Sequence, residues 1–327
     1  MSDTEGKIKD LKKNLKKINK NFDSMVLTTG GDHHLVVDKL PFEIPSLDSM
    51  LGGGLPIGRI TLVYGDFSSG KTFLSLKAIA AAQAKGMSVI LIDSDRSYEP
   101  KWAKLVGVDV SNLIVARPNY GEQALDLAEA LISSGEDLVI MDTMDALLPI
   151  SDAESDMEDN FIGLQSRMIS RGLRKILRVN QKTIFFAISH VREGFGRFAS
   201  KRIPGGKAQE EMASLMLLIS KGAAIKDEEN DPKKRVGFNM RVTIEKDKIH
   251  GNMYDSCELP FRFKDGAIDT MSGLFQLGLD VGVIKKSGGW YDFMDKHVMG
   301  KLGVIELLRG NEDLQLELRN QIEKEKE

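Results

Sequence analysis

The feature that most constrains this chain is a glycine-rich loop between an apolar segment and an alanine-rich one. Residues 60–64 form an apolar run typical of a buried strand, and residues 73–86 have the composition of a helix. The loop between them has a glycine, four residues, a glycine, a lysine and a hydroxyl residue, which is a phosphate-binding pattern in the required strand–loop–helix context. Its members are Gly65, Asp66, Phe67, Ser68, Ser69, Gly70, Lys71 and Thr72, followed by Phe73.

Each residue type in this loop has a chemical reason. Gly65 and Gly70 permit backbone conformations that turn successive N–H groups inward onto phosphate oxygens. The positive end of the following helix adds to this attraction. Lys71 is expected to reach the β- and γ-phosphates, and the Thr72 hydroxyl to bind Mg²⁺. We therefore predict that the chain binds a nucleoside triphosphate.

Length and composition narrow the class of protein. With 327 residues, the chain is long enough for a complete α/β core with smaller accessory parts. Its net charge of −3 indicates that any nucleic-acid surface has to be local. The single cysteine, Cys257, excludes an internal disulfide and suits a reducing compartment. Because no apolar stretch is long enough to cross a bilayer, we expect a cytoplasmic protein without a membrane partner.

The first segment has the pattern of a basic amphipathic helix. It carries seven lysines between residues 7 and 20, and its apolar residues recur every three or four positions: Ile8, Leu11, Leu15, Ile18 and Phe22. A helix this short is marginal alone, so its apolar stripe is expected to dock. The pattern leaves open whether the partner is its own domain or a neighbouring subunit.

The central section alternates strands and helices. Apolar runs predict strands at 60–64, 88–92, 138–142, 183–189 and 215–219, with helices at 121–133 and 161–179 between them. Ser46 is expected to cap a short helix that reaches Leu51. Continuous apolar strands separated by helices indicate an α/β fold with a mostly parallel twisted sheet flanked by helices. Asp95, Asp142 and His190 follow strand ends, and are therefore expected at the one sheet edge where ligands bind.

Two carboxylates at this edge have predicted roles. Asp142 closes an apolar strand, where it is expected to hold Mg²⁺ together with Thr72. Hydrolysis also requires a carboxylate that orients the attacking water, and Asp95 is the leading candidate. Asp93 and Glu99 are its rivals, and for Asp93 the pattern favours a helix cap or loop role equally.

A basic, glycine-containing segment spans residues 191–208 and carries Phe195 and Phe198 among its charges. Cations that follow phosphates and aromatic rings that contact bases suit single-stranded nucleic acid. The alternative is a solvated basic loop whose phenylalanines fold back onto the core. Its cations are Arg192, Arg197, Lys201, Arg202 and Lys207. The polar stretch 151–160 is predicted to be a second loop at the same edge.

Alternation of apolar and polar residues from Phe238 to Glu245 predicts a half-buried strand. Lys246 and Lys248 fall two residues apart in the continuation of this alternation, so their ammonium groups are expected to leave the same side of the chain. The pattern alone fits either a pair that reaches a nucleotide phosphate or ordinary surface charge. The charged stretch 226–234 is expected to be an exposed hairpin tip.

Strings of residues along nearly the whole chain resemble those of the RecA recombinase family, in the family's order. They are 53–59 (Gly-Gly-Leu-Pro-Ile-Gly-Arg), the loop 68–72, 121–125 (Gly-Glu-Gln-Ala-Leu), 204–208 (Pro-Gly-Gly-Lys-Ala), Lys246-x-Lys248 and 288–291 (Gly-Gly-Trp-Tyr). The resemblance implies a DNA-dependent ATPase that uses ATP and Mg²⁺. Such a protein forms a helical filament of identical copies on single-stranded DNA and exchanges that strand into a homologous duplex, in recombination and in repair of DNA damage.

The same resemblance implies site roles. Trp102 falls where an aromatic ring stacks on adenine, and Glu99 where an acid meets the amino group of the base. Lys246 and Lys248 would reach the ATP of the adjacent copy, and the N-terminal helix would dock on a neighbour. The two loops, 151–160 and 191–206, would bind DNA through Ile162, Arg167, Arg171, Arg192, Phe195, Arg197, Lys201, Arg202, Gly205, Gly206 and Lys207.

The sequence departs from the bacterial pattern at two positions. Asp95 stands where the family has the hydrolytic glutamate, and His190 replaces the glutamine that senses the γ-phosphate. We infer that both act in catalysis, with Lys71, and that the chain fits a phage-encoded relative acting in the host cytoplasm. The predicted divisions are residues 1–35 (oligomerisation helix and linker), 36–268 (ATPase core with DNA-binding loops) and 269–327 (small α/β domain).

Two other functions share this core. A recombination mediator or paralogue would bind ATP and DNA without exchanging strands. A hexameric helicase or clock-type ATPase would form a closed ring. The complete basic loop and the Lys246/Lys248 pair favour a recombinase over the first. The Gly289-Trp290 region and the loop from Arg192 to Lys207 favour it over the second.

Overall fold

The computed structural model describes residues 7–8, 10–11, 13–14, 17, 19–20, 28, 30–32, 35–153, 163–192, 203–227, 231–264 and 267–325. Its chain divides into two compact units, residues 1–38 and 39–327. In the first unit the described residues between 7 and 19 are helical, as the lysine-rich pattern predicts. Among the described residues, no helix combines the length and apolar character that a membrane span requires.

One large sheet organises the second unit. In the part of the chain that the structure describes, nine strands pair in the order β11-β10-β9-β8-β3-β7-β6-β4-β5. The parallel strands are β3 (Ile60–Gly65), β4 (Val89–Asp93), β5 (Ile114–Ala116), β6 (Leu138–Asp142), β7 (Ile184–His190) and β8 (Leu215–Asp227). The antiparallel strands at one side are β9 (Asp231–Asp247), β10 (Ser256–Arg262) and β11 (Ala267–Ile268). The predicted mostly parallel α/β fold is thereby confirmed.

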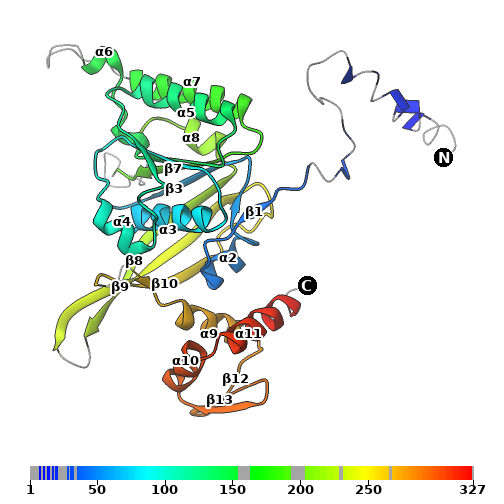
Figure 1. Cartoon of the computed structure of the whole chain (residues 1–327), viewed down its shortest axis with the longest axis vertical. Coiled ribbons are helices and arrows are strands. Elements are labelled where there is room, and N and C mark those ends of the chain that lie inside the picture. The colour runs from blue at the N-terminus through cyan, green and yellow to red at the C-terminus, as the bar shows by residue number, and fades with distance from the viewer. Residues whose placement is uncertain are drawn as a thin grey trace, which may run out of the picture. The chain divides into compact units, whose positions relative to one another are not determined.

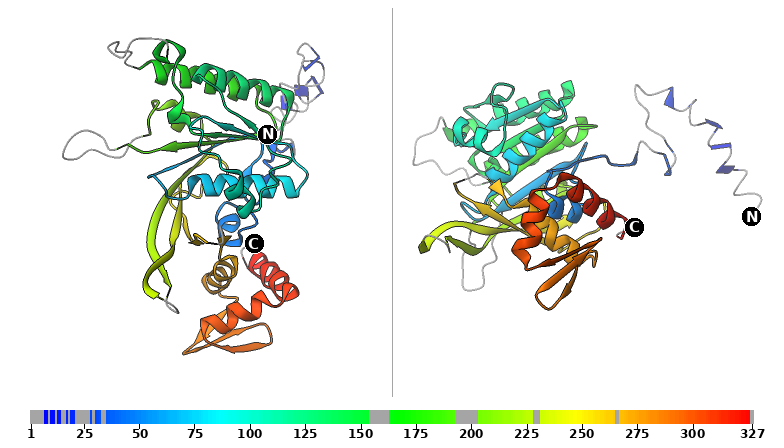
Figure 2. Two further views of the ribbon diagram at one scale, coloured as in Figure 1. Left: turned by 60° about the vertical axis from the view of Figure 1, so that its left-hand side comes forward. Right: turned by 60° about the horizontal axis from the view of Figure 1, so that its bottom comes forward.

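Helices cover both faces of the sheet because the central strands are apolar on both faces. In β7, Phe186 and Ile188 face the helix α3, whereas Phe185 and Ala187 face α5 and α7. Successive strand residues point to opposite faces, so a continuous apolar run is what a doubly covered strand requires. Figures 1 and 2 show α3 and α4 on one side of the sheet and α5 and α7 on the other. These helices are α3 (Lys71–Ala84), α4 (Pro100–Val106), α5 (Gly121–Ser134) and α7 (Leu164–Val179).

Shorter elements connect this layer structure. They are β1 (Lys39–Leu40), α2 (Pro45–Met50), β2 (Leu55–Pro56), the 3₁₀ turn η2 (Met144–Ala146), α6 (Ile150–Ala153) and α8 (Ala208–Met212). The predicted cap of α2 is wrong: Ile44 occupies the N-cap position, and Ser46 lies inside the first turn. Asp48 instead accepts hydrogen bonds from the backbone N–H groups of Phe42 (2.6 Å) and Ile44 (2.9 Å). Burial of this carboxyl raises its pKa to about 6.

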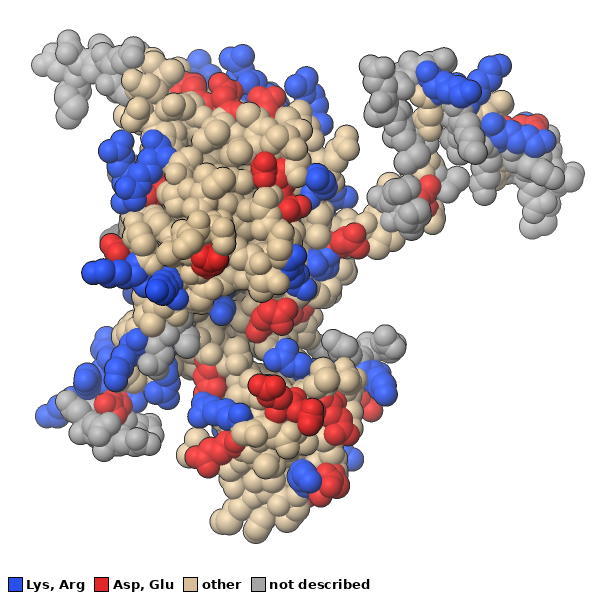
Figure 3. Space-filling view, in the orientation of Figure 1, with Lys and Arg blue, Asp and Glu red and all other residues tan. Residues whose placement is uncertain are grey.

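Strands β8 and β9 form a long hairpin, and Lys226, Lys233 and Lys234 near its turn are exposed, in line with the exposed tip predicted at 226–234; residues 228–230 of that stretch lie outside the described residues. The predicted strand at 215–219 is only the buried first part of β8, which continues to Asp227 with mostly exposed residues. Lysine and arginine side chains gather along this hairpin (Figure 3). They include Lys221, Lys226, Lys233, Lys234 and Arg235.

The C-terminal part forms a separate apolar core. Its elements are α9 (Thr270–Asp280), β12 (Lys285–Ser287), β13 (Trp290–Phe293), β14 (Lys296–Met299), α10 (Lys301–Arg309) and α11 (Glu312–Lys324), and the three strands form their own sheet. Phe275 packs edge-on against Tyr291, with ring centroids 5.1 Å apart. The small C-terminal α/β domain of the predicted fold is therefore present.

Candidate active site

The phosphate loop joins the end of β3 to the start of α3, as predicted. Gly70 has φ +108° at the N-cap of α3, and a Cβ atom on it would lie 2.3 Å from the Met240 sulfur. A Cβ atom on Gly65 would lie 2.0 Å from the Ile219 carbonyl oxygen in the neighbouring strand. Only glycine fits at these two points, so the tight turn and the close strand packing both depend on them.

Lys71 is the buried cation of the loop. Its side chain is 4% exposed, and its Nζ donates to the carbonyl oxygens of Gly65 (3.1 Å) and Asp66 (2.8 Å). Burial lowers the pKa of Lys71 to about 8, although the nearby carboxylates of Asp142 and Asp145 oppose that shift. The loop thus holds an ammonium group whose solvation is poor and which a phosphate would stabilise.

Thr72 and Asp142 meet at the carboxyl edge of the sheet. The Thr72 hydroxyl donates to Asp142 Oδ2 at 3.0 Å. Asp142 is 3% exposed, and its Oδ1 has no hydrogen-bond partner in the described part of the chain. Burial raises the pKa of Asp142 to about 7, and the charge of Asp95 adds to the effect. An orphaned carboxylate oxygen beside a hydroxyl fits Mg²⁺, which prefers oxygen ligands.

A cation at this point would need ligands from a nucleotide and water. Within the described residues, no cluster of three or more His, Cys, Asp or Glu side chains is arranged to hold a metal. Mg²⁺ commonly keeps several waters and binds one or two protein oxygens plus substrate phosphates. The Thr72–Asp142 pair therefore has the composition of a triphosphate-dependent site.

The two aspartates after β4 have different surroundings. Asp93 is buried; its Oδ1 accepts from the N–H of Ser97 (2.9 Å), and its Oδ2 accepts from Arg117 Nε (2.9 Å). Asp95 is exposed, and its Oδ1 accepts a hydrogen bond from the Ser97 N–H at 3.1 Å. Because both oxygens of Asp93 are engaged, Asp95 is the better placed of the two to orient a water. Sequence reasoning missed the role of Arg117 in fixing Asp93.

Glu99 and Trp102 lie beside the Thr72–Asp142 pair. All four residues line one small cavity of about 20 Å³. Glu99 caps α4 by accepting from the Lys101 N–H at 3.2 Å. Trp102 is half-buried, edge-on to Phe261 with ring centroids 6.2 Å apart. The structure thus brings together the predicted metal ligands and the predicted base-contacting residues.

His190 ends β7 in direct register with the loop. It pairs with Gly65, and the Val191 N–H donates to the Gly65 carbonyl at 3.3 Å. Its side chain contacts Asp145, which sequence reasoning did not single out. The available signal was the position of Asp145, three residues beyond Asp142 at the same sheet edge. The predicted meeting of Asp95, Asp142 and His190 at one edge agrees with the strand register.

Lys246 and Lys248 leave the same side of the chain, as predicted, and both end on carbonyl oxygens of α8. Lys246 Nζ donates to Glu210 and Glu211, and Lys248 Nζ donates to Glu211 at 3.0 Å. Lys246 pairs with Met216 of β8, and Met216 in turn pairs with Leu62 of β3. Leu62 lies about 10 Å along β3 from Gly65, at about 3.3 Å per residue. The two lysines therefore lie toward the edge of the sheet where the parallel strands begin, whereas the phosphate loop of the same chain lies at the edge where those strands end.

The described DNA-binding candidates flank the ends of both predicted loops. Arg167 and Arg171 line a groove of about 340 Å³ along α5 and α7. The segment before α8 lies against α7, since a Cβ atom on Gly205 would sit 2.6 Å from Ile169, and one on Gly206 3.3 Å from Ser166. Arg192 and Lys207, at the two ends of the basic segment, are exposed. Residues 150–153 form α6, and Ile162, Phe195, Arg197, Lys201 and Arg202 lie outside the described residues.

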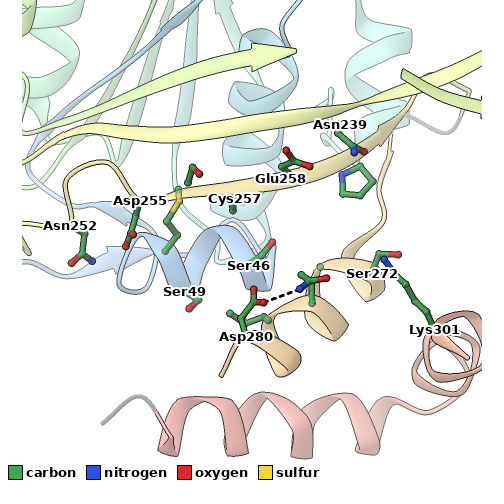
Figure 4. A pocket seen from close by; sticks show the side chains of 16 residues that line it. Ser46, Ser49, Asn239, Asn252, Asp255, Cys257, Glu258, Ser272, Asp280 and Lys301 are labelled. Atoms are coloured by element: carbon green, nitrogen blue, oxygen red, sulfur yellow. Dashed lines mark hydrogen bonds between the residues drawn. The ribbon is translucent and has the colours of Figure 1, made fainter. Parts of the chain in front are cut away.

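A larger cavity of about 790 Å³ lies away from this edge, between α2, β10 and the C-terminal elements (Figure 4). Its wall includes Asp255, Glu258 and Asp280, and Gln276 Nε2 donates to Asp280 Oδ1 at 2.9 Å. None of the predicted nucleotide- or DNA-binding residues lines it. Size alone therefore does not locate the site that the motifs predict.

Comparison with known proteins decides the family. A profile of the RecA N-terminal domain matches residues 9–267, and one of the RecA C-terminal domain matches residues 272–327. The chain belongs to the RecA family. Protein RecA of Clostridioides difficile strain 630 is 36% identical over 330 aligned residues, covering 98% of this chain and 93% of that protein. Protein RecA of Chlorobaculum tepidum is 34% identical, with 97% of this chain and 92% of that protein covered. Protein RecA of Francisella tularensis subsp. novicida is 37% identical, with 93% of this chain and 86% of that protein covered.

The RecA relatives bear on the alternatives raised from the sequence. They match this chain over both domains and carry the name of the recombinase itself, so neither a mediator nor a ring-forming ATPase is favoured. These relatives are bacterial proteins, and the expectation of a phage-encoded member finds no support in them.

Proposed function

We propose that this RecA-family chain is an ATP-dependent DNA recombinase that forms a helical filament on single-stranded DNA and pairs that strand with a homologous duplex. The observation that carries the proposal is the complete phosphate loop with its Thr72–Asp142 pair, in a chain matched by RecA relatives over nearly its full length. We also keep the predicted division at residues 1–35, 36–268 and 269–327, with the first segment docking on a neighbouring copy.

ATP binding follows from the loop. The backbone N–H groups of residues 65–70 and the start of α3 would surround the phosphates, and Lys71 would exchange its carbonyl partners for phosphate oxygens. Thr72 and Asp142 would hold Mg²⁺, which neutralises charge on the β- and γ-phosphates when bound. Glu99 and Trp102 would contact the base, since they line the same cavity as the metal pair.

Hydrolysis would use Asp95 as the carboxylate that orients water. The contacts of Asp93 with Ser97 and Arg117 support this choice because they leave Asp93 no free oxygen. His190 would report the γ-phosphate to the basic segment that follows β7. DNA binding would use Arg167, Arg171, Arg192, Gly205, Gly206 and Lys207, with Ile162, Phe195, Arg197, Lys201 and Arg202 from the two loops.

Lys246 and Lys248 would complete the nucleotide site of the adjacent copy. Their position toward the opposite sheet edge supports this, because each chain then presents a phosphate loop at one edge and two cations at the other. In the single chain these ammonium groups are held by α8 carbonyls, which phosphate oxygens of a neighbour would replace. A nucleotide that contacts both copies would favour the interface over the separate chains, so we expect the interface to be stronger when ATP is bound.

A mixing experiment tests this arrangement. Lys71→Ala should inactivate the phosphate loop, and Lys246→Ala/Lys248→Ala should remove the cations that contact the neighbour's nucleotide. Each variant alone should therefore lack DNA-stimulated ATPase activity. Mixed in equal amounts, they should regain about a quarter of wild-type activity, because about one interface in four combines an intact loop with intact lysines.

The matched control is Lys85→Ala/Lys182→Ala, which removes two exposed lysines and should leave activity unchanged. No recovery in the mixture would refute the shared site. Strand exchange by the wild-type protein, and helical filaments on single-stranded DNA in electron micrographs, test the function as a whole; closed rings or absent exchange would overturn it.

A further inference from the structure

A three-residue contact links the phosphate loop to the end of β7. The Phe67 ring, whose residue is 72% exposed, stacks on the His190 imidazole with centroids 4.6 Å apart and planes 25° apart. On another side of the imidazole, Asp145 Oδ2 lies 3.0 Å from His190 Nδ1. Asp145 belongs to the η2 turn that follows β6, so three separate segments converge on one histidine.

Both carboxylate oxygens of Asp145 contact His190. Oδ1 accepts from the His190 backbone N–H at 3.0 Å, while Oδ2 meets the ring nitrogen. The side chains of His190 and Asp145 are 18% and 13% exposed, so water competes little for these bonds. An ionised carboxylate can only accept hydrogen bonds, and the proton of a neutral His190 must therefore sit on Nδ1.

That assignment restricts what Nε2 can do. In the neutral ring Nε2 carries a lone pair and accepts, yet a phosphate oxygen also only accepts. His190 can hold a phosphate oxygen through Nε2 only after a second proton binds there and makes an imidazolium. The Asp145 carboxylate at 3.0 Å stabilises that cation, as does the phosphate itself.

We propose that Asp145 is a positioning residue that fixes the orientation and tautomer of His190, so that triphosphate binding is coupled to uptake of one proton from solvent at His190 Nε2. The inference rests on the proposed function, in which His190 senses the γ-phosphate. Phe67 covers the ring and ties its position to the tip of the loop.

The charged side chains at this edge of the sheet either favour or disfavour a positive charge on His190. Carboxylates favour the imidazolium, and nearby cations disfavour it. The carboxylates are Asp145 from η2, Asp142 from β6 and Asp66 from the loop; the cations are Lys71 from α3, Lys221 from β8 and Arg192 beyond β7. Because Asp145 also supports the charge of Lys71, nucleotide affinity alone does not isolate its effect on His190.

The first test needs no nucleotide. Two-bond ¹⁵N–¹H NMR spectra of ¹⁵N-histidine-labelled protein distinguish the two tautomers, and His190→Gln assigns the His190 signals. We expect the Nδ1–H form in the wild type and loss of that preference in Asp145→Asn. The control Asp137→Asn alters a carboxylate bonded to Ser88 at the other end of β6 and should leave the spectrum unchanged. A wild-type ring protonated on Nε2 alone would overturn the proposal.

The second test measures protons directly. Calorimetric titration with a non-hydrolysable ATP analogue and Mg²⁺ at pH 7, in two buffers of different ionisation enthalpy, gives the number of protons taken up. Wild type and Asp137→Asn should take up more protons with the triphosphate than with ADP, and His190→Gln should lose that excess. Asp145→Asn should reduce it and weaken triphosphate binding by about tenfold, the cost of one charge-assisted hydrogen bond.

The outcomes separate this inference from the proposed function. Binding of the triphosphate with no excess proton uptake, or an excess that survives in His190→Gln, overturns the coupling alone. Failure to bind any triphosphate overturns the proposed function together with the coupling. If Asp145→Asn does not fold, His190→Gln still decides the case, because it removes the titrating ring and keeps the carboxylate.

Discussion

We predict that the buried ammonium of Lys71 makes nucleotide affinity depend on pH in a range where most lysines stay charged. Burial lowers the pKa of this group to about 8 in the free protein, against an ordinary value of 10.5. A bound phosphate stabilises the charged form, so the pKa of Lys71 rises in the complex. Raising the pH through 8 removes the proton from the free protein, and part of the binding free energy must then restore it. Affinity should therefore fall as pH rises.

The size of the effect follows from this pKa. If only the charged form binds, affinity is proportional to the protonated fraction, which falls from about three quarters at pH 7.5 to about 3% at pH 9.5. The dissociation constant should rise about 25-fold over this range, or about 1.9 kcal/mol at 1.36 kcal/mol per factor of ten. A lysine with its ordinary pKa would give less than a twofold change.

The assay is equilibrium binding of a fluorescent ADP analogue with Mg²⁺ at fixed ionic strength from pH 7.5 to 9.5. Lys71→Arg keeps its charge throughout, so its affinity, whatever its absolute value, should vary little with pH. Lys77→Arg is the matched control, because Lys77 lies on the same helix and burial also lowers its pKa. This variant should keep the full dependence. Wild-type affinity that stays within about twofold across the range would refute the reasoning.

Three further changes test the surrounding geometry. Asp95→Glu should raise DNA-stimulated ATPase turnover about tenfold or more, since misplacing a base by an ångström can cost about 100-fold; an unchanged rate counts against Asp95 as the water-orienting group. Arg117→Ala leaves Asp93 Oδ2 buried without its partner and should lower the free energy of unfolding in urea by about 1–3 kcal/mol; equal midpoints would contradict this. Gly70→Ala forces a Cβ atom against Met240 at positive φ, and should lower the thermal midpoint and abolish nucleotide binding; a stable, binding-competent variant would show that the loop tolerates a side chain there.

Two patterns located strands in the sequence. Mostly apolar runs predicted β3, β4, β6 and β7, which are buried on both faces, and alternation from Phe238 to Glu245 predicted the half-buried part of β9. The outer half of β8 was missed, since its exposed residues from Lys221 onward lack such a run and are held by pairing with β9. The short strand β5 was also missed, because its three residues are too few to form a recognisable run and none of them is fully buried.

The sequence predicted those residues of the candidate site whose positions depend only on where a strand ends. Asp142 and His190 follow apolar strands, and parallel strands end at one edge, so their meeting with the phosphate loop followed from the sequence. The pairing of Asp145 with His190 did not, because it depends on how the η2 turn returns against β7. The choice between Asp93 and Asp95 likewise required the contacts of Arg117, a residue that no motif includes.

The separation of the phosphate loop from Lys246 and Lys248 across one sheet has a consequence for growth. In the proposed shared site the phosphate loop of one copy meets the lysines of the next, so the contact is head-to-tail, and it gives an open filament when the rotation between copies does not close a ring. Such a filament would have an unpaired phosphate loop at one end and an unpaired Lys246–Lys248 surface at the other. A protein that mimics either half would stop elongation in one direction only, and the polymer would lengthen at unequal speeds from its two tips.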